Sequence, residues 1–161
     1  MTEIILIAHD IRSAHNVGSL LRSSDGFGVT RFIASGVTPY PELPDDTRLP
    51  HIAKRLTSQI AKTSLGAETY MKIEHYETPP LDALRSAGYT IVGLEQDPTA
   101  VNLRDYKAPN KLALLLGEEV NGMPPSLRTE CDVLLEIPMF GRKESFNVSV
   151  AAAVALYQLI R

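Results

Sequence analysis

Short apolar runs are the feature of this sequence that most constrains its fold. Each run is three to five residues long and almost continuously apolar, and the intervals between the runs have helical periodicity. Strands in a parallel sheet have this character, because helices cover both of their faces. The runs lie at 4–7, 32–34, 89–92, 112–116 and 133–137.

The intervals between these runs supply the helices. Pro79-Pro80 begins one of them and Gly88 ends it, as is usual for the two ends of a helix. A chain of 161 residues is large enough for one cored domain. We therefore expect an α/β fold in a single domain over residues 1–161: an open parallel sheet with helices on both faces. The expected helices lie at 16–27, 48–63, 80–87 and 146–160.

The composition restricts the classes of partner. With 16 Lys+Arg against 19 Asp+Glu the net charge is −3, so any RNA binding has to depend on a local basic patch. No apolar run approaches the roughly 20 residues of a membrane span, and the N-terminus has no leader pattern. The lone Cys131 has no partner for an internal disulfide. We expect a cytoplasmic protein without membrane contact.

Several common functional motifs are missing from the sequence. A dinucleotide-binding fold would need G-x-G-x-x-G between its first strand and helix, but residues 16–22 read NVGSLLR there. A Walker-A motif, an H-E-x-x-H pair and a cluster of Cys and His are also missing, and the four histidines have no metal-ligand spacing. We therefore expect no metal site, and histidines that are solvated or hydrogen-bonded in the core.

Polar loops follow three of the apolar runs, at 9–16, 117–122 and 138–147. The carboxyl ends of parallel strands share one edge of a sheet, where α/β folds bind their ligands, so we expect these loops to meet. Arg12 and Arg22 could hold phosphates bidentately there. Taken singly, the polar residues have plainer explanations as turns and helix N-caps. The candidate caps are Asn16, Ser145 and Asn147.

Three segments form one pattern across nearly the whole chain. They are 16-NVGSLLR-22, 114-LLLGEEVNGMP-124 and 137-IPMFGRKESFNVSVAAA-153. Together they resemble the motifs of the SpoU/TrmH family of SPOUT-class RNA ribose 2′-O-methyltransferases, in the family's order. Phe146 departs from the pattern, because members usually carry Leu or Met there. Glu118 stands where many members have a smaller or amide residue, which leaves Glu119 as the match to the family's acidic position.

The resemblance implies a sheet whose C-terminal segment threads into a trefoil knot, an exception to the rule against knotted chains. It also implies that S-adenosylmethionine is the cofactor and that it lies bent in this knot, held largely by backbone groups. The matching cofactor residues are Leu94, Gly117, Ile137 and Ser145, with Met139 and Asn147 nearby.

The resemblance also gives roles to the polar residues of the motifs. Arg22 matches the family's proposed base, although a guanidinium normally stays protonated, so we expect it at least to polarise and position the ribose hydroxyl. Asn16 would orient Arg22 or the ribose, and Glu119 would hold the arginine in place. Ser145 and Asn147 would fix the reacting methyl group, and no metal is required.

The substrate implied by the resemblance is RNA, with tRNA preferred over rRNA because no N-terminal RNA-binding extension is expected. The helix expected at 48–63 carries several of the candidate contacts, but an ordinary solvated amphipathic helix explains its charges equally well. The candidate RNA contacts are Arg12, Arg48, Lys54, Arg55, Lys62, Arg142 and Lys143.

A homodimer is expected from the C-terminal helix, which is apolar on all sides. We expect the apolar stripe of 16–21 to pack against that of 148–159 across a two-fold axis, so that Arg22 of one chain serves the cofactor of its partner. Two other functions stay open. One is a non-catalytic RNA-binding SPOUT domain, and the other is a flavodoxin-like module that binds a small molecule.

Overall fold

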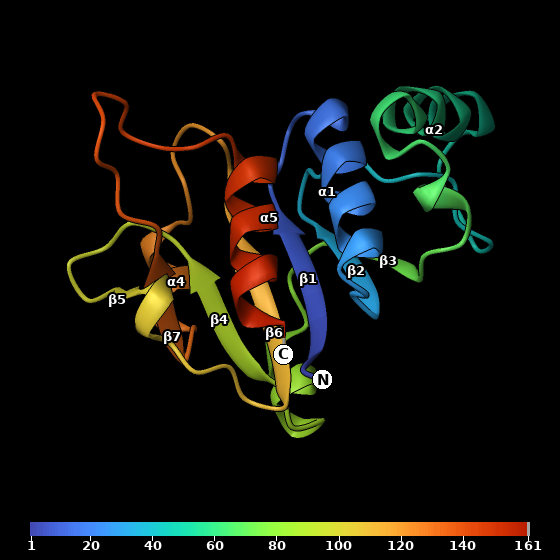
Figure 1. Cartoon of the computed structure of the whole chain (residues 1–161). Helices are drawn as coiled ribbons and strands as arrows, with labels where there is room; N and C mark the ends of the chain where they lie inside the picture. The colour runs from blue at the N-terminus through green and yellow to red at the C-terminus, as the bar shows by residue number, and fades with distance from the viewer. Residues whose placement is uncertain (161) are drawn as a thin grey trace.

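The protein, described here by a computed structural model over residues 1–160, is built on one seven-stranded sheet (Figure 1). The strand order is β3-β2-β1-β6-β4-β7-β5, and every pair of neighbouring strands is parallel. The predicted open parallel sheet is therefore confirmed. The strands are β1 Glu3–His9, β2 Arg31–Ser35, β3 Ile73–Tyr76, β4 Thr90–Leu94, β5 Val101–Asn102, β6 Lys111–Leu116 and β7 Val133–Glu136.

Five α-helices and two short 3-10 helices complete the described chain. The four predicted helices are present, with ends shifted by a few residues. The sequence patterns did not predict β3, β5 or α4. The helices are α1 Ala14–Gly26, α2 Pro50–Ser64, α3 Leu81–Ser86, α4 Pro125–Thr129 and α5 Val148–Leu159, and the 3-10 helices are η1 Ala67–Thr69 and η2 Leu103–Asp105. None of the helices is long and apolar enough to cross a membrane.

The two faces of the sheet form two separate hydrophobic cores. Along β1, Ile4 and Leu6 point to the core that contains α1 and α5, whereas Ile5 and Ile7 point to the core that contains α3 and α4. Alternate residues of a strand point to opposite faces, so both sets have to be apolar when both faces are covered. This burial on both sides explains why the apolar runs of the sequence show no alternation.

Helices α1 and α5 lie side by side on one face of the sheet (Figure 1). The apolar stripes expected to pack across a two-fold axis are both largely buried in this single chain, so that expectation was wrong. The reason is that α1 packs against α5 within the monomer, which covers both stripes. The fully buried residues of the two stripes are Val17, Leu20, Leu21, Ala152, Ala155 and Leu159.

A different face of α5 stays exposed. Val150, Val154 and Tyr157 are 49%, 43% and 77% exposed. Their spacing of four and three residues places them on one stripe of the helix. The all-round apolar character of α5 therefore has two parts, a buried face against α1 and the sheet and an exposed one.

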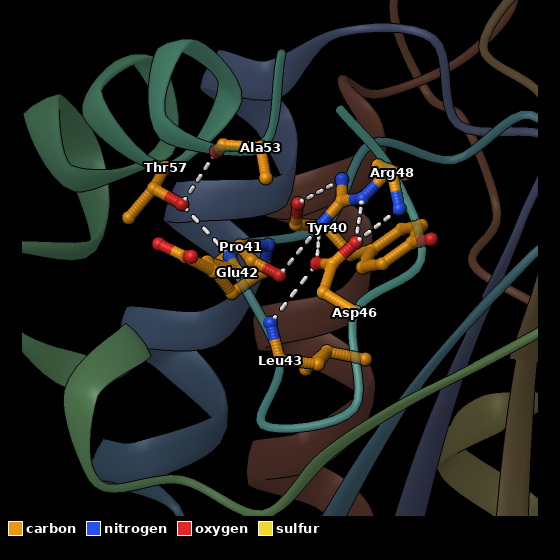
Figure 2. Close-up of polar contacts among 8 residues, drawn as sticks. All are labelled: Tyr40, Pro41, Glu42, Leu43, Asp46, Arg48, Ala53 and Thr57. Atoms are coloured by element: carbon orange, nitrogen blue, oxygen red, sulfur yellow. Dashed lines mark hydrogen bonds and ion pairs between the residues drawn. The ribbon is translucent and has the colours of Figure 1, made fainter. Parts of the chain in front are cut away.

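The connection from β2 to α2 is held by Arg48, as Figure 2 shows. Its guanidinium binds the Asp46 carboxylate, donates to the carbonyl oxygens of Tyr40 and Pro41 at 2.9 and 3.0 Å, and lies 3.6 Å from the centre of the Tyr40 ring. The side chains of Arg48 and Asp46 are only 17% and 8% exposed. The expectation that Arg48 contacts RNA was therefore wrong, because its donors already have partners inside the protein.

Candidate active site

The carboxyl ends of β1, β6, β4 and β7 are neighbours in the sheet. Figure 1 shows the connection from β1 to α1 and the long connection from β7 to α5 at this same edge. The three polar loops of the sequence pattern therefore meet, as expected for parallel strands.

A chain of hydrogen bonds joins the three loops. The Glu119 carboxylate accepts from the Asn16 side-chain amide at 3.1 Å and from the backbone N–H groups of Arg12 and Ser13 at 3.2 and 3.3 Å. The side-chain oxygen of Asn16 accepts in turn from the Asn147 amide at 3.2 Å. One residue from each motif thus takes part in a continuous network.

Asn16 is available for this network because Ser13 is the N-cap of α1. The Ser13 hydroxyl accepts from the backbone N–H of Asn16 at 3.1 Å, in the first turn of the helix. The reading of Asn16 as the cap was therefore wrong. Its side chain projects towards the loop after β6 instead.

Glu119 is ionised in this network. Burial raises the pKa of its carboxyl, but the hydrogen bonds from Asn16 and from the N–H groups of Arg12 and Ser13 outweigh burial and hold the pKa below its ordinary value. The carboxylate therefore serves as a fixed acceptor that anchors the start of α1.

Asn147 caps α5, as one reading of the sequence proposed. Its side-chain oxygen accepts from the backbone N–H groups of Ser149 and Val150 at 2.9 and 3.4 Å and from the Ser149 hydroxyl at 2.6 Å. Ser145 takes no part in this cap.

A cavity of about 290 Å³ lies beside the network, between the loops that follow β4, β6 and β7. Four of the expected cofactor residues line it: Leu94, Gly117, Ile137 and Ser145. Met139 and Asn147 do not line it, so the set of cofactor residues expected from the sequence was too wide. The amide and oxygen of Asn147 are both used, by Asn16 and by the cap. The lining residues are Leu94, Glu95, Gln96, Leu116, Gly117, Glu118, Glu119, Val120, Asn121, Gly122, Leu135, Glu136, Ile137, Glu144, Ser145, Phe146, Val148 and Ala151.

The loop after β6, which lines the cavity, requires glycine at position 117. A Cβ at this position would lie 2.6 Å from the Met123 nitrogen and 2.7 Å from the Gly122 carbonyl carbon. The loop folds back because the Gly122 N–H donates to the backbone carbonyl oxygen of Glu118 at 2.9 Å. Gly122 has a φ of +66°, which favours glycine. Backbone groups of the loop therefore reach the cavity at a point where a larger residue would collide with them.

Arg22 lies away from this cavity. It is an exposed residue of α1, and its guanidinium has no hydrogen bond or ion pair within residues 1–160. Six residues separate it from Asn16, which turns the side chains roughly 120° apart on the helix. Glu119 binds Asn16 and two backbone N–H groups, so the expected contact of Glu119 with Arg22 is not made within the chain.

The other basic candidates are exposed. The Arg12 guanidinium lies 3.8 Å from Glu118 at the rim of the cavity. Three residues belong to α2 and two to the loop between β7 and α5, so they do not form one compact patch in the chain. They are Lys54, Arg55, Lys62, Arg142 and Lys143.

Several lining residues were missed by the sequence reasoning. The Glu95 carboxylate accepts from the Met123 N–H at 2.7 Å, and the Gln96 amide donates to the Glu144 carbonyl oxygen at 2.7 Å. Glu95 and Gln96 directly follow β4, and Glu136 ends β7. The rule that ligands bind at strand ends could have found them, because the predicted run 89–92 ends shortly before Glu95 and Gln96, and Glu136 lies near the end of the predicted run 133–137.

Two of the histidines, His9 and His75, have side-chain contacts inside the protein. His9 Nδ1 lies 2.9 Å from the Ser35 hydroxyl, and the His75 ring stacks on Tyr40 with centroids 4.1 Å apart. Within residues 1–160, no group of three or more His, Cys, Asp or Glu side chains is placed to hold a metal ion.

Known proteins resemble this chain over nearly its whole length. Residues 3–157 match the model of the SpoU rRNA methylase family. A protein of Staphylococcus haemolyticus, assigned to the TrmH family of tRNA/rRNA methyltransferases, is 32% identical over 163 residues. That match covers 98% of this chain but 58% of the relative, so the chain spans little more than half of that protein.

Solved structures share the fold. The AdoMet-bound rRNA methyltransferase of Sinorhizobium meliloti has a TM-score of 0.79 at 22% identity, covering 97% of this chain and 55% of that one. A structure that was solved in a study of the 2-OH methylation of C/U34 on tRNA has a TM-score of 0.71 at 21% identity. The match covers 98% of this chain and 93% of that one.

Proposed function

This chain belongs to the SpoU rRNA methylase family, and on that premise we propose that it transfers a methyl group from S-adenosylmethionine to a ribose 2′-hydroxyl of RNA. Members of this family have a knotted α/β fold. Membership of the family therefore supports the C-terminal trefoil knot that the sequence predicted. The observation that carries the proposal is the convergence of three loops, joined through Glu119, Asn16 and Asn147, beside a cavity at the carboxyl edge of the sheet.

The cavity suits S-adenosylmethionine in its lining. Gly117 leaves backbone free to contact a nucleoside, and apolar side chains of Leu94 and Ile137 provide surfaces for an aromatic base. Glutamates in the lining match the positive charge of the cofactor. When bound, S-adenosylmethionine supplies an electrophilic methyl group on a cationic sulfur.

Arg22 is the residue that we propose to act on the ribose. Its guanidinium stays protonated at neutral pH, so it polarises and positions the 2′-hydroxyl, and a neighbouring RNA phosphate can assist removal of the proton. Asn16 and Glu119 hold the start of α1, the helix that carries Arg22, in a fixed orientation. Ser145, in the cavity lining, would position the methyl group, with Asn147 fixing the start of the following helix.

The proposed substrate is structured RNA, with tRNA favoured. The fold match that covers 93% of its partner chain is the one described by methylation of tRNA, which supports this choice. Exposed cations at Arg12, on α2 and at 142–143 would bind phosphates, although the net charge of the chain is −3.

We also propose that the active form is a homodimer. The exposed stripe of Val150, Val154 and Tyr157 on α5 provides an apolar surface for a second copy. Arg22 does not line the cavity of its own chain, so a partner's cavity is a suitable place for it to act.

The test is transfer of a labelled methyl group to a mixture of unmodified tRNA and rRNA. Arg22→Ala should lower the single-turnover rate by about 100-fold or more while cofactor affinity stays within about twofold. Lys107→Ala, which removes another exposed cation, is the matched control and should keep the wild-type rate. RNA binding without any transfer would instead favour the non-catalytic RNA-binding domain.

A further inference from the structure

The charged side chains that line the cavity are all of one sign. Five of its eighteen lining residues are glutamates, and none is Lys, Arg or His. The glutamates come from the end of β7 and from the loops that follow β4, β6 and β7, so their convergence is a property of the fold. They are Glu95, Glu118, Glu119, Glu136 and Glu144.

Three of these carboxylates are tied to the protein. Glu95 accepts from the N–H groups of Met123 and Gln96 at 2.7 and 3.1 Å, and Glu118 accepts from the Asn121 N–H at 2.9 Å. Glu119 belongs to the network with Asn16. Hydrogen bonds from neutral N–H groups fix these carboxylates without cancelling their charge.

Counter-charges near the cavity are few. Glu118 lies 3.8 Å from Arg12, whose side chain is mostly in solvent. The carboxylates of Glu136 and Glu144 have no hydrogen bond or ion pair within residues 1–160. Gln96 holds Glu144 through its backbone carbonyl oxygen, which keeps this part of the loop beside the cavity and leaves the carboxylate unpaired.

Resting on the proposed function, we infer that Glu136 and Glu144 make the cavity select the cationic methyl donor over its own product. In S-adenosylmethionine the ammonium and carboxylate of the methionine part cancel, so the sulfonium leaves a net charge of about +1. In S-adenosylhomocysteine the sulfur is a neutral thioether and the net charge is near zero. The two molecules are otherwise almost the same size, so charge is the main property by which this cavity can distinguish them.

The reaction itself removes the charge that the cavity attracts. A bond forms between the ribose oxygen and the methyl carbon, and the bond between that carbon and sulfur breaks. Its electron pair stays on sulfur, which becomes neutral, and the hydroxyl proton leaves to solvent. With an effective dielectric constant of about 20, loss of one charge near unpaired carboxylates changes affinity on the order of tenfold. Product release is therefore favoured, and product inhibition is weak.

Calorimetric titration of the full chain tests this inference directly, with no RNA present. The ligands are S-adenosylmethionine, S-adenosylhomocysteine and the amine analogue sinefungin, which carries a positive charge but no transferable methyl. The first and third should bind about tenfold more tightly than S-adenosylhomocysteine at low salt, and less so at high salt. In Glu136→Gln/Glu144→Gln the preference should fall at least about threefold, because the cations bind more weakly while S-adenosylhomocysteine is unaffected.

Glu77→Gln is the matched control. Glu77 follows β3, the outermost strand beyond β1 and β2, whereas the cavity lies at β6, β4 and β7, so its replacement should leave the preference unchanged. Glu144→Gln alone, in an exposed loop, gives a second variant that should fold normally. Equal affinities for donor and product, or a preference that survives both substitutions, would overturn the inference while leaving the proposed function intact. If none of the three ligands binds, the proposed function fails, and this inference fails with it.

Discussion

The side-chain amide of Asn147 donates a hydrogen bond to the side-chain oxygen of Asn16 at 3.2 Å. The two residues are separated by 131 positions in the sequence, and each lies at the beginning of a helix. The oxygen of the same Asn147 side chain caps α5. One amide therefore joins α5 to α1 and, through Asn16, to Glu119 in the loop after β6.

The two functions of Asn147 can be separated by substitution. Asn147→Asp keeps an oxygen for the cap but loses the donor to Asn16, so its stability should stay near that of the wild type while methyl transfer falls. Asn147→Ala loses both and should lower the free energy of unfolding by about 1 kcal/mol. Urea unfolding and single-turnover assays measure the two effects, with the exposed Asn110→Ala as control. Equal loss of stability in both variants would assign that stability to the link with Asn16 instead of the cap.

The sequence predicted the architecture because the sheet is buried on both faces. Continuous apolar runs then mark the strands directly, as for Ile4 to Ile7. The edge strands β3 and β5 were missed, since β3 is half-exposed and carries Glu74 and His75, and β5 has only two residues. Strands that bury little apolar surface leave little pattern.

Residue roles were harder to predict than positions. The motifs meet as expected, but Ser13 caps α1 in place of Asn16, because both residue types can cap and only geometry decides which one does. Arg48 was assigned to RNA because the sequence does not reveal that Asp46 and Tyr40 fold around it. Long-range partners such as these depend on tertiary structure.

Arg48 is expected to stabilise the fold and to have no direct role in RNA binding. Arg48→Ala removes the guanidinium from the buried Asp46 carboxylate, which keeps only backbone N–H donors, and leaves the Tyr40 carbonyl oxygen without its donor. The free energy of unfolding should fall by about 2 to 4 kcal/mol. Arg55→Ala, at an exposed position of α2, is the matched control and should change stability by less than about 0.5 kcal/mol. A stable Arg48→Ala protein that has lost RNA affinity would reverse this assignment.

The pair of Arg48 and Asp46 also makes the free energy of unfolding depend on pH. The hydrogen bond from Arg48 holds the pKa of Asp46 well below its ordinary value, and burial offsets only part of this effect. A carboxyl whose pKa is lowered by folding contributes stability that is fully present above its unfolded pKa, near about 4, and is lost as the pH falls through the folded pKa. The stability difference between wild type and Asp46→Asn should therefore be constant from about pH 8 to 5 and shrink below about pH 4.

Gly18 and Gly26 provide a matched pair on α1. A Cβ at Gly18 would lie 2.0 Å from the Thr63 hydroxyl oxygen and 2.3 Å from the Ile60 carbonyl oxygen, so Gly18→Ala should separate α1 from α2 and destabilise by about 1 to 3 kcal/mol. At Gly26 nothing lies within 4 Å of the same atom. Gly26→Ala should be neutral or stabilise by up to about 1 kcal/mol, because alanine favours the helix. Thermal unfolding distinguishes them, and equal effects would contradict the close helix crossing.

The exposed face of α5 is expected to form the dimer. Val154→Glu places a charge in the stripe with Val150 and Tyr157 without disturbing the core, so it should give a folded monomer in sedimentation. Val37→Glu adds the same charge at a 66% exposed position between β2 and α2 and should leave the dimer intact. A dimer that persists in Val154→Glu would exclude this face.

If the dimer forms, Arg22 of one chain should serve the cavity of the other. Arg22→Ala and Asn147→Ala are each expected to be inactive alone, because one removes the residue that positions the ribose and the other disturbs the start of α5. In a heterodimer, the cavity of the Arg22→Ala chain is intact and receives Arg22 from its partner. Random mixing should therefore restore about a quarter of the wild-type activity, since half of the dimers are mixed and each holds one intact site. If mixed dimers form and remain inactive, Arg22 acts within its own chain. That result would place the ribose next to α1 of the same subunit. Because Arg22 does not line its own cavity, α1 or the bound RNA would then have to move to bring the ribose and the cofactor together.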